Sequence, residues 1–252
     1  MSRVAAVTGA SAGIGRATAI AFGELGWTVA VGARRIEQLE ETAKLVDGAG
    51  GRALVHVLDV TDSASVDAFC EFVTRAAGPI DVLVNNAGTA LPGDLHEMTD
   101  DDLRRIVETN LLGPVIMSSR VVGALRASGA TTGDIVFISS DSTVHPRPAM
   151  APYVATKAGL EAFAATLALD LEGSGLRASV VRLGPTQGTS FADSWDPDIF
   201  EELFPRWRRF GLQRHFHTMQ PEDVARAVVQ VVTAPAHMWV PVLEVQPNPP
   251  LD

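Results

Sequence analysis

The chain has 252 residues, of which 46% are hydrophobic, and it carries a formal net charge of −10. This size and composition predict a globular protein with one large α/β domain or two small ones. The acidic balance, without a basic stripe, argues against nucleic-acid binding. The single cysteine, Cys70, cannot form an internal disulfide and lies in an apolar helical pattern, so we interpret it as a core residue.

The N-terminal residues enter a predicted strand almost at once, and no secretory leader precedes it. No apolar run reaches the roughly 18 residues that suggest a membrane span. We therefore expect a soluble cytoplasmic protein without a membrane partner.

Predicted strands and helices alternate along the chain. In order they are a strand at 3–7, a helix at 13–25, a strand at 28–33, a helix at 36–46, a strand at 52–58, a helix at 63–77, a strand at 80–84, a helix at 101–126, a strand at 134–138, a helix at 151–172, a strand at 177–183, a helix at 221–233 and a strand at 239–245. The strands are continuous Val, Ile, Leu and Ala runs, which is typical of parallel sheets covered on both faces. The sequence predicts an α/β fold: a single doubly wound Rossmann-type domain over 1–252, with about seven parallel strands, helices on both faces and ligands at the carboxyl ends of the strands.

The first strand runs into Thr8-Gly9-Ala10-Ser11-Ala12-Gly13-Ile14-Gly15, and a helix follows. Glycines here allow a sharp turn and let a pyrophosphate approach the backbone and the helix N-terminus. The spacing G-x-x-x-G-x-G differs from the common dinucleotide fingerprint, and such a turn can also be a plain strand-to-helix connection. Its position between the first strand and the first helix favours a nucleotide site.

Tyr153 is the only tyrosine, and Lys157 is one of two lysines. Four residues apart in a predicted helix, they share one helical face. A phenol beside an ammonium is a plausible proton-transfer pair, because the positive charge favours phenolate and lowers the phenol's pKa. The same spacing also arises by chance, so the pair alone is a weak indication.

Together these motifs make the chain resemble the short-chain dehydrogenase/reductase family. The family pattern T-G-x-x-x-G-I-G is matched by Thr8, Gly9, Gly13, Ile14 and Gly15, and further family residues follow in order: Asp59-Val60, Asn85-Asn86-Ala87-Gly88, Asn110, Ser140, Tyr153 and Lys157. Ser140 precedes Tyr153 by thirteen residues, as in the family. The resemblance spans roughly residues 3–190 and implies an NAD(P)-dependent oxidoreductase that interconverts a carbonyl and a secondary alcohol by hydride transfer.

The resemblance also assigns roles to four catalytic residues. It implies that Tyr153 is the general acid and base, and that Ser140 polarises the substrate oxygen. It implies that Lys157 lowers the tyrosine pKa and binds the nicotinamide ribose. It also implies that Asn110 distorts the helix at 101–126 and that its backbone carbonyl holds a proton-relay water. Ser139 is expected to be structural.

The end of the second strand bears on the choice of cofactor. Ala33 stands where an acidic residue would bind the ribose diol of NAD, and Arg34 and Arg35 follow. Guanidinium donors suit a 2′-phosphate, so similarity to NADP-preferring members favours NADP(H), with Arg34 as the main contact and Arg35 assisting. Alternatively, both arginines lie in solvent near the next helix and the cofactor is NAD. The basic residue often found at the Ala12 position in NADP-preferring relatives is absent.

The cofactor site implied by the resemblance gathers residues from several strand ends. It comprises Gly9, Ser11, Gly13, Ile14, Gly15, Arg34, Arg35, Asp59, Val60, Asn86, Ala87, Gly88, Tyr153, Lys157, Gly184, Thr186 and Thr189. Asp59 would accept from the adenine amino group rather than cap the next helix, which Asp62 suits better. Leu183 and Gly188 depart from the family pattern, and either Thr186 or Thr189 could replace its threonine.

The predicted substrate pocket consists of Ser140, His145, Tyr153, Phe191 and Trp195. His145 and Arg147 fit a solvated loop better than a substrate contact. The aromatic-rich segment takes the place of the family's substrate lid, within 188–217. Its aromatic side chains either line a pocket for a bulky apolar or aromatic substrate, or hold the lid together and contact a neighbouring subunit.

The remaining expectations concern partners and alternatives. His215 and His217 alternate without a third ligand at metal spacing, so we predict no metal site. The helices at 101–126 and 151–172 resemble the family's dimer-forming pair, so a homodimer or homotetramer is expected, with a small-molecule carbonyl or alcohol as substrate. The alternative function is a non-catalytic NAD(P)-binding sensor or scaffold. Relatives that catalyse dehydration or epimerisation usually alter the four catalytic residues.

Overall fold

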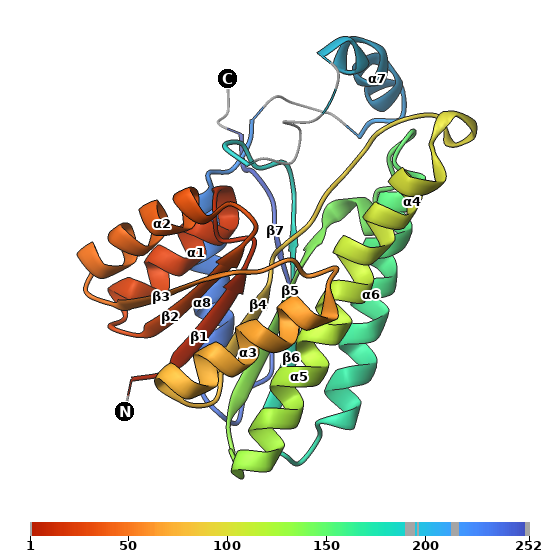
Figure 1. The fold of residues 1–252 in the computed structure, drawn as a ribbon. Helices are drawn as coiled ribbons and strands as arrows, with labels where there is room; N and C mark the ends of the chain where they lie inside the picture. The colour runs from red at the N-terminus through yellow and green to blue at the C-terminus, as the bar shows by residue number, and fades with distance from the viewer. Residues whose placement is uncertain (1, 190–194, 196, 213–216, 250–252) are drawn as a thin grey trace.

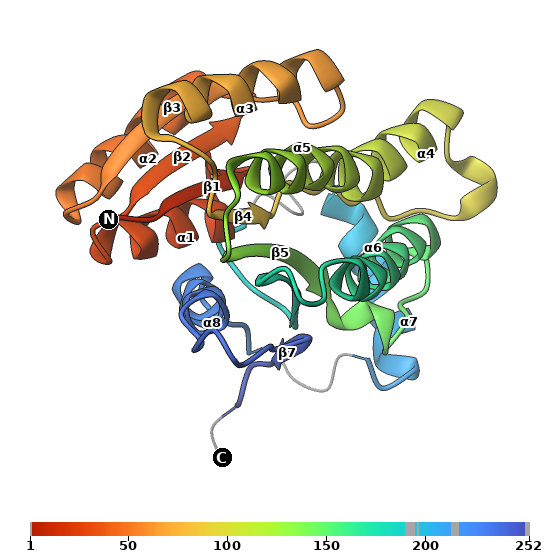
Figure 2. The same ribbon diagram turned by 90° about the horizontal axis from the view of Figure 1, so that it is seen from below.

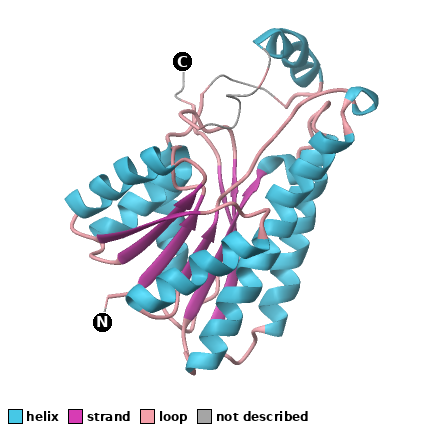
Figure 3. Cartoon of the chain, in the orientation of Figure 1, coloured by secondary structure: helices cyan, strands magenta, loops and turns pink. Residues whose placement is uncertain are grey.

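The computed structural model describes residues 2–189, 195, 197–212 and 217–249. It contains a sheet of seven parallel strands in the order β3-β2-β1-β4-β5-β6-β7 (Figures 1 and 3). The strands are β1 Val4–Thr8, β2 Thr28–Ala33, β3 Arg52–Val57, β4 Val82–Asn85, β5 Gly133–Ser140, β6 Leu176–Leu183 and β7 Val242–Val245. The strand order reverses at the β1–β4 pair, and in such sheets ligands bind outside the carboxyl ends of the strands at this point. The predicted fold class is confirmed.

Helices cover both faces of this sheet (Figure 2). Successive strand side chains point to opposite faces, so Val4 and Ala6 join one hydrophobic core and Ala5 and Val7 the other. The first core is closed by helices α3 Ser63–Ala77, α5 Gly113–Ser128 and α6 Ala151–Asp170. The second is closed by α1 Gly13–Glu24, α2 Ile36–Gly48 and α8 Pro221–Val232.

The helix expected over 101–126 is interrupted. It consists of α4 Asp100–Val107, a π-helical turn at Glu108–Leu112, and α5. Buried Asn110 lies in this turn, and its side chain bonds to the backbone of Thr89 in the loop after β4. A π turn widens the helix and leaves its carbonyls out of the regular bonding pattern, and such turns are frequent at functional sites. The π turn lies at the residue where the family resemblance implies a distorted helix.

The C-terminal part adds a helix above the sheet and a short edge strand. Helix α7, Pro197–Arg209, lies beyond the carboxyl ends of the strands, in the segment predicted as a lid (Figure 1). Strand β7 begins only at Val242, later than the expected 239, because Pro241 has no N–H to donate to the ladder. Short 3₁₀ turns occur at Leu95–Glu97 and Asp141–Thr143. In the described part of the chain, no helix is long and apolar enough to cross a membrane.

Candidate active site

The glycine turn between β1 and α1 requires its glycines. Gly9 and Gly13 adopt left-handed backbone angles, with φ of 66° and 54°, which L-residues with a side chain rarely adopt. A Cβ added at Gly15 would collide with the carbonyl oxygen of Gly9. Ala12 occupies the N-cap position of α1, and no side chain among the described residues caps this helix there. The first N–H groups of α1 are therefore suited to a phosphate.

Two predicted arginines follow β2 beside this turn. Arg35 Nη2 donates to Ser11 Oγ at 3.0 Å, which brings Arg35 to the glycine turn. Arg34 is exposed, and no hydrogen bond or ion pair of its side chain occurs within the described residues. Arg16 on α1 was not predicted, yet its guanidinium donates to the carbonyl of Ser11 at 2.7 Å and to Thr42 Oγ1 at 3.1 Å. The sequence marks Arg16 only as a charged residue just after the glycine pattern.

The loop after β4 is fastened to the glycine turn. Thr8 Oγ1 accepts from the backbone N–H groups of Asn86 and Ala87, at 3.0 and 2.9 Å. The Asn86 amide donates to the Thr8 carbonyl at 2.9 Å, while Asn85 donates to Ser118 on α5 at 3.1 Å. Both asparagines therefore have structural partners. Gly88 lies near the amine of Lys157, since an added Cβ would be 3.7 Å from Nζ.

Three further residues predicted to bind the cofactor, Asp59, Val60 and Ile14, also have contacts within the protein. Asp59 accepts from the backbone and hydroxyl of Thr61, and Asp62 caps α3, as the sequence indicates. Val60 is part of the hydrophobic core, and Ile14 of the other core. Each of these residues therefore has a structural role besides the cofactor contact that the resemblance implies.

Thr186 and Thr189 can be told apart by their neighbours. The Thr186 hydroxyl donates to the Gly184 carbonyl at 3.1 Å, within its own turn. The backbone of Thr189 instead lies beside Gly13, where an added Cβ would come within 3.1 Å of Thr189 Cα. Of the two threonines, Thr189 is therefore the one next to the glycine turn.

The four predicted catalytic residues are all buried, with exposed fractions of 0% for Asn110, 8% for Ser140, 7% for Tyr153 and 5% for Lys157. Ser140 ends β5 and hydrogen-bonds Tyr153 near the start of α6. Lys157 Nζ donates to the Ile138 carbonyl at 2.9 Å and lies 5.9 Å from the centre of the tyrosine ring. The Asn110 amide reaches α6 as well, through Thr156 Oγ1 at 3.3 Å. The structure thus brings Ser140, Tyr153 and Lys157 together, with Asn110 behind them.

Two tryptophans of the predicted lid segment cover Tyr153. Trp195 Nε1 donates to the Ala90 carbonyl at 2.9 Å, and Trp207 Nε1 donates to the Pro148 carbonyl at 3.0 Å. Their rings meet edge to face, with centroids 6.5 Å apart. Together with Ala90, Met150 and Leu203 they form a hydrophobic cluster that includes Tyr153. These aromatic side chains therefore both hold the segment to the loops after β4 and β5 and surround the tyrosine.

Not every predicted pocket residue joins this cluster. His145 is exposed, and Phe191 lies outside the described residues. Arg147 was expected in a solvated loop, which is wrong: its guanidinium binds Asp141 through two bonds of 2.7 and 2.8 Å, and the two side chains are only 10% and 9% exposed. A turn between the residues creates this contact, and their sequence separation of six gives no periodic pattern that would reveal it.

The model of the short chain dehydrogenase family matches residues 3–199. The chain belongs to this family.

The relatives of this short-chain dehydrogenase include proteins of similar and of much greater length. Sulfoacetaldehyde reductase 2 of Chromohalobacter salexigens is 33% identical over 253 residues, covering 98% of this chain and 95% of that protein. Glycine betaine reductase ATRR of Emericella nidulans is 31% identical over 246 residues, covering 98% of this chain but 19% of that longer protein. The structure of the closed form of serine dehydrogenase complexed with NADP+ matches with a TM-score of 0.83 and 30% identity, covering 96% of this chain and 94% of that one.

Burial dominates the electrostatics of the tyrosine in this short-chain dehydrogenase. Desolvation raises the pKa of Tyr153 to about 12, the hydrogen bond with Ser140 opposes the rise, the Asp141 charge adds to it and the Arg147 charge opposes it. The expected fall in the Tyr153 pKa is therefore not found. That expectation rested on the charge of Lys157 alone, whereas burial of the phenol is the largest cause of the shift in the pKa of Tyr153.

The pKa of Lys157 shifts in the direction that favours the neutral amine. Burial lowers the pKa of Lys157 to about 8, and the charge of Glu161, one helical turn further along α6, opposes this fall. Glu161 was not singled out in the sequence. Its only mark there is its position four residues after Lys157.

No group of three or more His, Cys, Asp or Glu side chains arranged to hold a metal occurs in the part of the chain that the structure describes. His217 is exposed, and His215 lies outside the described residues. Cys70 is half-buried, and burial raises the pKa of its thiol to about 11. This disfavours the reactive thiolate and agrees with its interpretation as a packing residue.

Proposed function

We propose that this protein is an NADP(H)-dependent oxidoreductase that interconverts a carbonyl and a secondary alcohol, with Tyr153 as general acid and base. The observation that carries the proposal is the buried cluster of Ser140, Tyr153 and Lys157 at the carboxyl end of β5. The glycine turn lies at the carboxyl end of β1 in the same sheet. Membership of the short-chain dehydrogenase family supports the reaction class.

The bound nicotinamide would supply or accept hydride at the substrate carbon. The chain's own residues handle the oxygen and the proton. The Ser140 hydroxyl holds the substrate oxygen, and Tyr153 donates a proton to it in reduction and takes one in oxidation. A tyrosine pKa of about 12 keeps the phenol protonated near neutral pH, ready to act as an acid. The Lys157 ammonium, beside the ring, stabilises the phenolate that remains.

The proposed cofactor contacts begin with the glycine turn, where backbone N–H groups suit the pyrophosphate. Arg34 and Arg35 would bind the 2′-phosphate of NADP, because Arg35 already contacts the turn and exposed Arg34 lies beside it. The related serine dehydrogenase complexed with NADP+ supports binding of NADP(H). The proposed site is completed by the other residues predicted to contact the cofactor, which are Asp59, Val60, Asn86, Ala87, Gly88, Tyr153, Lys157, Gly184, Thr186 and Thr189.

The proposed substrate is a small-molecule carbonyl or alcohol compound that carries a bulky apolar or aromatic group. Support comes from the side chains around Tyr153, where Trp195 and Met150 offer apolar surface and Ser140 the polar contact. Ser140, His145, Tyr153, Phe191 and Trp195 remain the proposed pocket residues. The pocket lies under a lid within 188–217 of one domain spanning 1–252.

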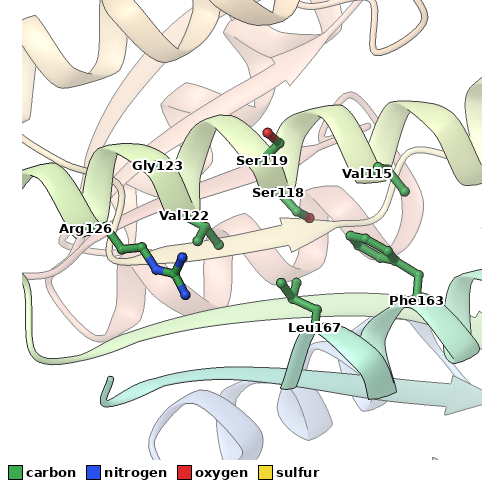
Figure 4. Close-up of a pocket in the computed structure, with 8 residues that line it drawn as sticks. All are labelled: Val115, Ser118, Ser119, Val122, Gly123, Arg126, Phe163 and Leu167. Carbon is green, nitrogen blue, oxygen red and sulfur yellow. The ribbon is translucent and has the colours of Figure 1, made fainter. Parts of the chain in front are cut away.

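A homodimer or homotetramer is proposed, formed by the α5 and α6 surfaces. Between these helices lies a groove with apolar Val122, Phe163 and Leu167 and basic Arg126 (Figure 4). An apolar groove on exposed helices suits contact with a second copy of the chain. Sedimentation as a dimer or larger species is expected, and a monomer at working concentrations would contradict it. We further propose a cytoplasmic location, with no nucleic-acid partner.

The decisive experiment measures turnover of ketones, aldehydes and alcohols by NADPH absorbance. The wild type should turn over members of this panel with higher efficiency for NADPH than for NADH. Tyr153→Phe should lower kcat by on the order of 10³-fold, because the proton donor is lost, while NADPH binding stays nearly unchanged. Binding without turnover in the wild type would favour the sensor or scaffold alternative, and equal efficiency with NADH would contradict the NADP assignment.

A further inference from the structure

Helix α6 meets the end of β5 through three successive helical turns. Tyr153 bonds to Ser140, and Lys157 bonds to the Ile138 carbonyl. One turn further, Glu161 Oε1 accepts from Ser139 Oγ at 2.6 Å. The first two contacts belong to the proposed catalytic residues, and the third does not.

The Glu161 carboxylate accepts three further hydrogen bonds besides the one from Ser139. Its Oε1 also accepts from Thr143 Oγ1 at 3.0 Å and from Arg182 Nε at 3.1 Å, and its Oε2 accepts from Arg182 Nη2 at 2.7 Å. The side chains of Glu161 and Arg182 are 17% and 16% exposed. A two-point bond between carboxylate and guanidinium fixes geometry as well as charge.

The same carboxylate is tied to the sheet. Ser139 on β5 is the register partner of Arg182 on β6, and Arg182 is the register partner of Glu244 on β7. Arg182 Nη1 also donates to Glu244 Oε2 at 2.9 Å. The three residues form one row across three neighbouring strands, and Glu161 joins α6 to that row.

We propose that Glu161 is a positioning residue: it fixes the Ser139–Ser140 end of β5 against α6, and it places a carboxylate one helical turn from Lys157 on the same face of that helix. The inference rests on the proposed function, because Ser140 and Tyr153 must face the same substrate oxygen. A shift of the strand end would separate them.

Few charged groups face Lys157 besides Glu161. Tyr153 precedes it on α6, and Arg182 on β6 lies behind Glu161. The turn after β5 contributes Asp141, which is paired with Arg147, and the π turn contributes the neutral amide of Asn110. Glu244 on β7 lies beyond Arg182, and α4, which also packs on α6, carries Arg104 and Arg105 at the surface. Burial lowers the pKa of Lys157, and Glu161 is the group that opposes this.

The charge can be tested by a direct titration, because the chain has only two lysines. A sample labelled with ¹⁵N at lysine gives two side-chain signals, with exposed Lys44 as internal reference. In Glu161→Gln the amide oxygen can still accept from Ser139, but the charge is lost, so Lys157 should titrate at lower pH than in the wild type. Glu161→Asp keeps the charge and should retain the wild-type midpoint. An unchanged midpoint in Glu161→Gln would overturn the proposal.

Kinetics test the positioning. Glu161→Gln should lower kcat by about tenfold, leave KM for the carbonyl substrate nearly unchanged, and move the alkaline limb of the kcat profile to lower pH. Ser139→Ala should lower kcat without moving that limb. Glu244→Gln, at the outer end of the row, is the matched control and should change neither. A loss of folding stability in Glu161→Gln without these changes would leave Glu161 a merely structural residue and contradict the proposal.

Two further outcomes are distinguishable. If the wild type has no turnover, the proposed function fails, and the lysine titration still decides the role of the Glu161 charge. If Glu161→Gln does not fold, Arg182→Gln provides the opposite change: the charge of Glu161 loses its main partner, so Lys157 should titrate at higher pH than in the wild type. A midpoint that stays fixed in Arg182→Gln would overturn the inference.

Discussion

Two ion pairs flank the neighbouring serines at the end of β5, and they are built differently. Asp141 and Arg147, next to Ser140, are six residues apart, within one loop, and bind each other through two bonds. Glu161 and Arg182, beside Ser139, come from a helix and a strand. The first pair is confined to the loop after β5, whereas the second joins α6 to the sheet.

The two pairs also act on different groups. The charges of Asp141 and Arg147 shift the pKa of Tyr153 in opposite directions, and the charge of Glu161 raises the pKa of Lys157. At the tyrosine the two charges oppose each other, and desolvation is the largest cause of the raised pKa. At the lysine Glu161 is the one charge that shifts the pKa among those identified. Each pair can therefore be tested by the group that it influences.

The largest effect is expected where a buried charge loses its partner. Arg147→Met leaves the Asp141 carboxylate buried and unpaired, which should cost about 3–5 kcal/mol of the free energy of unfolding. Urea denaturation measures this loss. The double variant Asp141→Leu with Arg147→Met removes both charges and should recover most of it. A loss below about 1 kcal/mol in the single variant would mean that the pair behaves as a surface ion pair.

The buried lysine predicts an unusual dependence of stability on pH. The unfolded chain keeps the lysine proton up to the ordinary pKa of 10.5, whereas the folded protein releases it near pH 8. The unfolded state binds more protons between these values, so this group's contribution to stability rises with pH by on the order of 3 kcal/mol. Lys157→Met should lack that rise. The Cys70 thiol, with its pKa raised to about 11, titrates in both proteins and cancels in the difference.

The measurement is the free energy of unfolding by urea at pH 8 and at pH 10.5, the two ends of this range. Lys44→Met is the matched control, because Lys44 is exposed on α2 and its removal should leave the rise intact. The same pH dependence in Lys157→Met and the wild type would contradict the lowered pKa.

A smaller effect separates the two pairs at the tyrosine. Asp141→Asn removes the charge that raises the pKa of Tyr153, so this pKa should fall, whereas Glu161→Gln should leave it unchanged. Tyr153 is the only tyrosine, so its phenolate can be followed by ultraviolet difference absorbance without overlap. Equal shifts in both variants would show that the two ion pairs do not act separately.

The sequence predicted those parts of the site that depend on local spacing. The glycine turn, Ser140 at a strand end and the Tyr153–Lys157 spacing are all local patterns, and the structure brings them to one edge of the sheet. The Glu161–Arg182 pair could not be predicted, because it needs the β5–β6 register and the packing of α6 on the sheet. The raised Tyr153 pKa depends in the same way on tertiary burial, in a hydrophobic cluster that includes Trp195 and Trp207.

Irregularities in one loop and one helix depend on contacts with distant parts of the chain. Ala149, two residues after Arg147 in the loop after β5, has a left-handed φ of 63°, a conformation that its residue type does not favour, and its carbonyl accepts from the Gly93 N–H in another loop at 2.9 Å. The π turn at Asn110 interrupts a continuous helical pattern, because the amide bonds to Thr89 in another loop. In both places tertiary contacts override the local preference of the sequence.

The smallest effect is expected at the outer end of the strand row. The Glu244 side chain is 37% exposed, and its bond to Arg182 is therefore partly screened by solvent. Glu244→Gln should cost about 0–1 kcal/mol of the free energy of unfolding, far less than Arg147→Met, because Arg182 keeps its two bonds to Glu161. Urea denaturation of both variants under the same conditions gives the comparison. A cost above about 2 kcal/mol would show that Glu244 is needed to hold Arg182 on Glu161, and the inner and outer ion pairs would then form one cooperative unit.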